Sequence, residues 1–172
     1  MGAISEALKI KPRVFVSYHH KLDQAYYDSL SRAMSGTYSL VSDNSLDRTI
    51  DSDNVGYVMR QIREQFLTGT SCTIVLCGLE TPVRKYVDWE ILATLQKQHA
   101  LVGLKLPQLP IVNDGCAKPG RLQDNIDSGY AVWGHYSNAI ADPSHLAALV
   151  HSAREKPKRL IDNRRQRRLR NG

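Results

Sequence analysis

Short apolar runs alternate in this chain with longer segments of helical periodicity, and this alternation restricts the possible fold more than any other feature. Residues 13–17, 71–77 and 101–105 carry apolar side chains at successive positions, as strands covered on both faces of a sheet do. The segments between them carry apolar side chains at helical spacing. Strands and helices that alternate in this way predict an α/β fold with an open parallel sheet and helices on both faces.

Weaker patterns complete the expected order of elements. Residues 38–42 and 131–133 resemble short strands, which brings the sheet to about five strands. Helices are expected over residues 21–34, 55–66, 81–99 and 144–156. The first of these helices carries one apolar stripe, made of Leu22, Ala25, Tyr26, Leu30 and Ala33.

Turn-forming residues mark where these helices begin and end. Gly36 and Gly69 end the first two helices, and Thr81 and Asp142, each followed by proline, are expected to cap the last two. The segment 43–53 is polar and reads as a loop, and 107–120 is a turn-rich connection. The candidate caps of the second helix are Asp51, Ser52 and Asp53.

The positive charge of the chain is concentrated at one end. From Arg154 onward there are nine Lys or Arg residues and two acidic residues, whereas the preceding 153 residues carry 14 basic and 15 acidic side chains. We therefore expect an N-terminal extension over 1–11, a folded domain over 12–153 and a solvated basic tail over 154–172. Nucleic acid is not an expected partner of the neutral domain, and only the tail offers a surface for it.

The chain shows no sign of export or of a membrane segment. No apolar run approaches 18 residues, and residues 1–10 lack the basic and apolar parts of a secretory signal. Three cysteines, an odd number, favour free thiols in a reducing compartment. These features predict a cytoplasmic protein without a membrane partner.

Several familiar chemistries are excluded at the carboxyl ends of the strands, where ligands bind in such sheets. The first strand is followed by neither a glycine-rich dinucleotide motif nor a phosphate loop, and the third ends without the Asp of a phosphoacceptor domain. Cys72 and Cys77 lie five apart on one strand and face opposite sides, so they cannot share a metal ion. His19 and His20 have no second ligand cluster. We expect no metal and no bound cofactor.

One carboxylate has a position suited to chemistry. Glu90 follows the buried position Val87 by three residues, and Tyr86 lies four residues before it on the same face of the helix. Helical side chains lean toward the N-terminus, which directs both toward the carboxyl edge of the sheet. From spacing alone, Glu90 can equally be an ordinary exposed helix residue.

Four segments together resemble a known family. They are RVFVSYHH at 13–20, TSCTIVLCG at 70–78, RKYVDWEI at 84–91 and VGL at 102–104. In combination they are similar to the bacterial TIR-like domains of Thoeris anti-phage defence, the ThsB family, over roughly residues 11–136. The segment 121–131 also resembles one that is common in these chains. The resemblance implies a flavodoxin-like open parallel sheet.

The resemblance also implies an activity. TIR enzymes cleave the nicotinamide–ribose bond of NAD with a Glu in an aromatic-x-x-x-Glu pattern, which Tyr86 and Glu90 match. A Trp is common at the position of Tyr86. By resemblance, NAD is the substrate rather than a cofactor, the product is an ADP-ribose derivative, such as a cyclic isomer, and a separate effector protein responds to it. Glu90 is the expected catalytic residue. The expected substrate-binding residues are Ser17, Tyr18, His19, Asp43, Gly78 and Tyr86.

Other interpretations of the same residues stay open. Tyr18 can be a packed aromatic at the rim, Asp43 a turn residue, and Asp23 either a helix-start residue or a ligand. The alternative function is a non-catalytic TIR-like scaffold that acts by self-association or nucleotide binding, and self-association is expected for an enzyme of this kind too.

Overall fold

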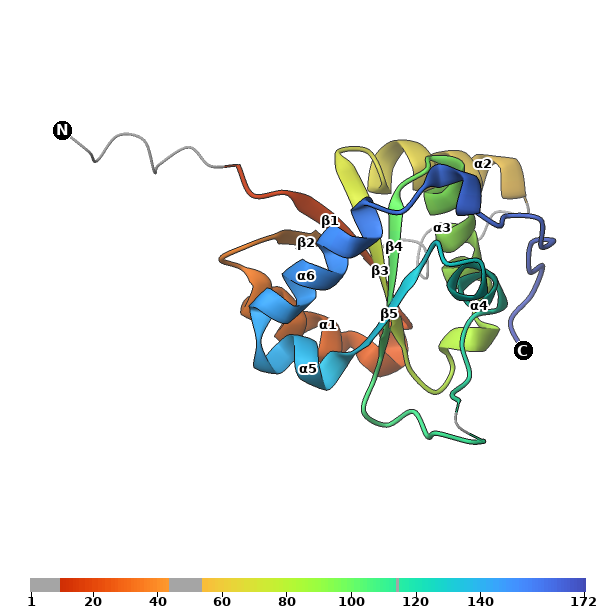
Figure 1. The fold of residues 1–172 in the computed structure, drawn as a ribbon. Helices are drawn as coiled ribbons and strands as arrows, with labels where there is room; N and C mark the ends of the chain where they lie inside the picture. Colours follow the sequence, from red (N-terminus) through yellow and green to blue (C-terminus); the bar gives the residue numbers. More distant parts are fainter. Residues whose placement is uncertain (1–9, 44–53, 114) are drawn as a thin grey trace.

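Five parallel strands form one sheet in the order β2-β1-β3-β4-β5 in the computed structural model, which describes residues 10–43, 54–113 and 115–172 (Figure 1). This order is the flavodoxin-like one, in which the chain reverses direction across the sheet between β1 and β3. The fold class expected from the sequence is therefore confirmed. The strands are β1 Arg13–Ser17, β2 Ser39–Val41, β3 Thr70–Cys77, β4 Ala100–Lys105 and β5 Val132–His135.

Helices cover both faces of the sheet, so the molecule has three layers (Figure 1). One face carries α1 His20–Met34, α5 Tyr136–Ala141 and α6 Pro143–Arg154. The other carries α2 Val55–Gln61, the π-helical turn η1 Ile62–Phe66, α3 Lys85–Gln96 and α4 Gly120–Asp127. Two short 3-10 turns, η2 Thr81–Val83 and η3 Lys158–Leu160, complete the described elements.

The core lies in separate clusters on the two faces of the sheet. Val16, Ile74 and Val102 point toward α1 and α6, whereas Val75 and Leu101 pack with side chains of α3 and α4. Because β1, β3 and β4 are buried on both faces, apolar residues occupy successive positions in each of them. This explains why these three strands are the ones most plainly visible in the sequence.

Helix α3 is buried around its whole circumference over Val87–Leu95, which is unusual for a helix on the outside of a sheet. Three of the buried positions are polar, and each has a partner. Asp88 pairs with Arg121, Glu90 with Ser17, and Thr94 with Thr73, whose hydroxyl oxygen lies 2.7 Å away. The buried polar groups of α3 thus fix how the helix sits between its neighbours.

The apolar stripe expected for α1 is wrong in part. Leu22 is 49% exposed and Ala25 is exposed, whereas Asp23, Leu30 and Met34 are the buried positions. The helix is rotated relative to the expectation because the carboxylate of Asp23 is packed beneath the loop after β3. A stripe drawn from hydrophobicity alone cannot anticipate a buried acid.

Two helices and two caps differ from expectation. Both α4 and α5 were absent from the expected order of elements. Thr81 does not cap a helix: its hydroxyl donates to the Leu76 carbonyl and accepts from the Gly78 amide, so it closes the turn after β3. The cap of α2 is Asn54, which accepts from the Tyr57 amide, and the candidates at 51–53 lie outside the described residues. Asp142 caps α6 as expected.

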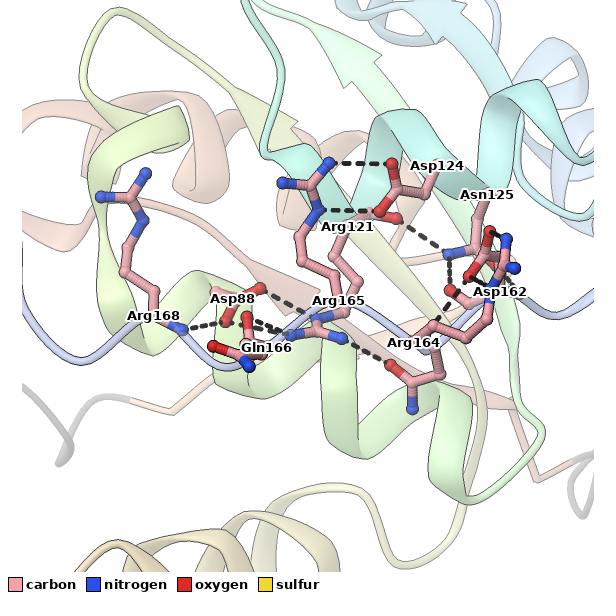
Figure 2. Close-up of polar contacts among 10 residues, drawn as sticks. Asp88, Arg121, Asp124, Asn125, Asp162, Arg164, Arg165, Gln166 and Arg168 are labelled. Carbon is pink, nitrogen blue, oxygen red and sulfur yellow. Dashed lines mark hydrogen bonds and ion pairs between the residues drawn. The ribbon is translucent and has the colours of Figure 1, made fainter.

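The basic tail contacts the domain, although its residues are exposed or half-buried. After α6, residues 155–172 turn back across the molecule and run along the outer side of α4 and α3 (Figure 2). The tail lacks an apolar stripe because it is held by hydrogen bonds of its backbone and polar side chains. Within the described parts of the chain, no helix has the length and apolar character needed to cross a membrane.

Candidate active site

The candidate site lies beyond the carboxyl ends of β1 and β3, at the point where the strand order reverses. Ser17 is the last residue of β1 and pairs in register with Val75 of β3. Loops leave the sheet in opposite directions at this point, which opens a crevice in folds of this type. Residues after these two strands are therefore the first to consider as ligands.

Glu90 and Ser17 meet at this edge of the sheet. The Ser17 hydroxyl donates a hydrogen bond to Oε2 of Glu90, and the two side chains come from β1 and α3. Glu90 is 3% exposed and Ser17 is 1% exposed. The alternative that Glu90 is an ordinary exposed helix residue is wrong, because its helix is covered on all sides.

Glu90 is one of the residues that line a small cavity. The cavity has a volume of about 10 Å³ and is lined by Tyr18, His19, His20, Arg84, Tyr86, Val87 and Glu90. Four of the seven residues expected at the site (Tyr18, His19, Tyr86 and Glu90) therefore lie together around one cavity. This volume is room for roughly one water molecule.

Two tyrosines contribute differently to the cavity. Tyr86 is half-buried and its ring meets that of Trp89 edge-on at 5.4 Å. Tyr18 is 2% exposed, stacks on Tyr27 at 4.9 Å and donates to Oε1 of Gln24 at 2.8 Å. Burial raises the pKa of Tyr18 to about 12, so its phenol stays protonated and serves as a donor.

His19 is held in one tautomer by its surroundings. Its Nδ1 accepts a hydrogen bond from the Lys21 amide at 3.2 Å, and its Nε2 lies 3.0 Å from Oε2 of Glu80. A nitrogen that accepts from a backbone N–H carries no proton, so the proton of a neutral ring sits on Nε2 and is donated to Glu80. The buried ring thereby links the start of α1 to the loop after β3.

Gly78 lies against a buried acid rather than at the cavity. A Cβ at Gly78 would lie 2.5 Å from Oδ2 of Asp23, so this position has no room for a side chain. Asp23 is 1% exposed, its Oδ1 accepts from Gln108, and its Oδ2 has no hydrogen-bond partner. Desolvation raises the pKa of Asp23, an effect that the nearby His19 and the Gln108 hydrogen bond oppose.

Comparison with known protein families identifies the family of this chain. The family model of the Thoeris protein ThsB, TIR-like domain, matches residues 15–110. The chain belongs to this family. The matched part begins in β1 and ends after β4, so it includes Ser17, the Asp23–Gly78 contact and the whole of α3.

Other comparisons add little to the ThsB-family assignment. Among solved structures, the TIR domains of the activated Roq1 resistosome are similar at 12% sequence identity, covering 85% of this chain and 86% of that chain with a TM-score of 0.41. No curated protein matches the chain.

The remaining expected residues of this ThsB-family chain are placed as follows. Asp43 is fully buried at the end of the segment after β2, and the residues that follow it lie outside the described part. Asp43 and Gly78 do not line the cavity, and Ser17 reaches it only through Glu90. Cys72 and Cys77 belong to the clusters on opposite faces of the sheet, as expected. Within the described ranges, no three potential metal ligands gather at one point.

Three residues at the site were not predicted from the sequence. Arg84 and His20 line the cavity, and Glu80 pairs with His19 and lies 3.8 Å from Nη1 of Arg84. Arg84 stands two residues before Tyr86, so a basic residue beside the aromatic-x-x-x-Glu pattern was an available signal. No sequence pattern marked Glu80, because its loop comes close to His19 only in the folded protein.

Proposed function

We propose that this ThsB-family protein cleaves the nicotinamide–ribose bond of NAD, with Glu90 as the catalytic residue. The observation that carries the proposal is a buried carboxylate that borders a cavity at the carboxyl ends of the strands. A carboxylate removed from water in this way acts on nearby charge through a medium of low dielectric constant. Membership of the ThsB TIR-like family supports the same activity.

The reaction suits a single carboxylate. In NAD the nicotinamide ring is a cationic pyridinium, and it becomes a neutral molecule when its bond to ribose breaks. No general acid is therefore needed to protonate the leaving group. The ribose becomes oxocarbenium-like as the bond breaks, and a fixed anion beside C1′ stabilises that charge in the transition state. The Ser17 hydroxyl holds Oε2 of Glu90 in place for this role.

Other side chains at the cavity fit the rest of the substrate. Arg84 and His20 can face the negative diphosphate, and the Tyr86 ring offers an apolar surface to the nicotinamide or ribose. Since the cavity holds about one water molecule, NAD binding requires the half-buried side chains at its rim to move. Of the other expected residues, Tyr18 and His19 shape the wall, and Asp43 and Gly78 act from outside it.

The rest of the proposal follows the family. The product is an ADP-ribose derivative, formed when water or a nucleophile within the molecule captures the ribose cation, and a cyclic isomer results in the second case. A separate effector protein responds to this diffusible nucleotide. The catalytic domain spans 12–153, and self-association completes the active form.

The test is to incubate the purified protein with NAD, with and without a lysate of phage-infected cells as activator, and to separate the products by chromatography and mass. Nicotinamide together with an equimolar ADP-ribose derivative is the expected result. Glu90→Gln, purified in parallel, controls for contaminating activities. If NAD stays intact in every condition and Glu90→Gln still supports defence in cells, the protein is a scaffold that acts by assembly or nucleotide binding.

A further inference from the structure

The C-terminal residues 161–172, called the strap below, run in extended form across the outer side of α4 and α3 (Figure 2). The strap lies outside the segment that matches the family model. Many of its contacts are hydrogen bonds that buried polar side chains on α4 and α3 make with its backbone and its asparagine side chains. Such groups are costly to bury without partners, so this part of the fold is built around the strap.

Helix α4 provides the first group of side chains that bind the strap. Asn125 is fully buried; its amide donates to the Asp162 carbonyl at 2.7 Å, and its Oδ1 accepts from the Asp162 amide at 2.9 Å. Arg121, also fully buried, donates to Oδ1 of Asn163 at 2.8 Å and to the Gln166 carbonyl at 3.3 Å. These bonds hold the strap in one register along the helix.

Helix α3 provides the second part, at the two residues just before Glu90. The Arg168 amide donates to Oδ2 of Asp88 at 2.8 Å, and the Arg168 carbonyl accepts from Nε1 of Trp89 at 2.7 Å. Asp88 also pairs with Arg121 at 2.9 Å. One residue of the strap thus binds two consecutive side chains of α3.

The end of the strap reaches the first turn of α3. The amide of Lys85 has no partner within its own helix, and Arg84 at the cap position gives no side-chain bond. Instead, Oδ1 of Asn171 accepts from the Lys85 amide at 2.9 Å, and the Gly172 amide donates to the Val83 carbonyl at 3.2 Å. A residue 86 positions away therefore caps the helix that carries Glu90.

We propose that the strap positions the catalytic carboxylate. The positioning residues are Asn171 of the strap and Trp89 of α3. This inference rests on the proposed function of Glu90. Glu90 contacts Ser17 on the sheet side of α3, while the strap holds the outer side and the first turn of the same helix. The helix is fixed from both sides, and a carboxylate displaced by about 1 Å can lose a hundredfold in rate.

The test compares three variants with the parent protein in NAD turnover and in amide hydrogen exchange. The first ends at Ile161 and lacks the rest of the strap. The second, Asn171→Ala, removes the cap alone, and Asn171→Asp restores an acceptor at that position. The matched control is Leu169→Ala, since Leu169 is 74% exposed on the outer side of the same segment.

The truncated protein is expected to lose at least about tenfold in kcat with little change in KM, because substrate contacts stay while the carboxylate shifts. Exchange in residues 85–89 rises by a similar factor, and exchange in β3 is unchanged. Asn171→Ala raises exchange of the Lys85 amide about fivefold and lowers kcat, and Asn171→Asp reverses both effects. Leu169→Ala matches the parent. A synthetic peptide of residues 162–172, added to the truncated protein, restores kcat.

Several outcomes would overturn the proposal. Unchanged exchange in residues 85–89 without the strap shows that α3 does not depend on it. Faster exchange with unaltered kcat shows that the strap stabilises α3 but does not position Glu90, and a higher kcat shows that it restrains the enzyme. A truncated protein that fails to fold leaves the decision to Asn171→Ala, where unchanged exchange and kcat refute the role. A parent protein inactive toward NAD refutes the proposed function instead.

Discussion

The hydroxyl of Ser17 and the carboxylate of Glu90 form a buried hydrogen bond between residues 73 positions apart in the sequence. One comes from the end of β1 and the other from the middle of α3, so the bond joins the sheet to the helix layer at the edge where ligands bind in this fold. A carboxylate with one oxygen held in this way keeps its orientation as charge develops next to it. The contribution of this hydrogen bond to catalysis can be measured by substituting either Ser17 or Glu90.

Glu90→Gln removes the negative charge and keeps the shape. Because the opposing charge exists only in the transition state, we expect turnover to fall by about a hundredfold to a thousandfold, roughly 3–4 kcal/mol of barrier, with KM little changed. Steady-state kinetics with NAD and thermal unfolding of the same preparation provide the measurement. A folded Glu90→Gln variant with the parent rate would remove the catalytic role of this residue.

Ser17→Ala removes the hydrogen bond and leaves the charge. Hydrogen bonds to ionised groups contribute about 1.5–3 kcal/mol, so a loss of roughly tenfold or more in kcat is expected. In the double variant with Glu90→Gln, the effect of Ser17→Ala should become much smaller, because the two groups act as one unit. Full additivity of the two changes would contradict a shared role.

Asp23→Asn is expected to stabilise the protein at neutral pH. The pKa of Asp23 is raised by burial, so the folded state favours the protonated acid and loses stability as pH rises through that pKa. Asn resembles the protonated form and avoids this loss. The gain in melting temperature should be larger at pH 7 than at pH 5 and should vanish below the ordinary Asp pKa of about 3.9, where both states are protonated. A variant less stable than the parent at pH 7 would show that the charge of Asp23 is needed.

Asp88→Asn leaves the fully buried Arg121 guanidinium without a counterion. Breaking a buried ion pair from one side costs about 3–5 kcal/mol, which urea unfolding would detect as a lower midpoint. The control is Asp124→Asn, whose partner Arg165 has a side chain that is 49% exposed, and it should cost about 1 kcal/mol or less. Equal costs for the two variants would mean that burial does not set the strength of these pairs.

Cys72 and Cys77 serve as core volume, and replacing either with Ala should cost about 1 kcal/mol with turnover unchanged. Burial raises the pKa of Cys72 to about 12 and also raises that of Cys77, so neither forms thiolate at pH 8. A thiol reagent should therefore modify the half-buried Cys116 first in the native protein. Loss of activity in a folded Cys77→Ala variant would place that residue in the site.

Strands β1, β3 and β4 could be predicted because burial on both faces requires apolar residues at successive positions. The helices were predicted less well, for a physical reason. In α4 the buried positions include Arg121 and Asn125, which face the strap, so polar residues are buried beside the apolar Leu122, and eight residues are few for a pattern. The six residues of α5 are too few to show a period at all.

The candidate site was predicted in its centre and missed at its edges. Tyr86 and Glu90 share a helix face, which spacing alone can predict, and both line the cavity. The burial of Glu90 could not be predicted, because it depends on how α3 packs against the end of β1, where Ser17 contacts the carboxylate. The Asp23–Gly78 contact joins the first turn of α1 to the loop after β3, 55 residues further along the chain, and likewise depends on the fold.

The bond between Asn171 and the Lys85 amide has a consequence for synthesis. A ribosome makes α3 about eighty residues before the segment that caps it, so the helix must first form with its outer side uncovered. During that interval Asp88, Trp89 and the opening turn meet only solvent or a chaperone on that side. Strands β1 to β4 can therefore pair first, while the helix that bears Glu90 acquires its cap only when the chain up to Asn171 has left the ribosome.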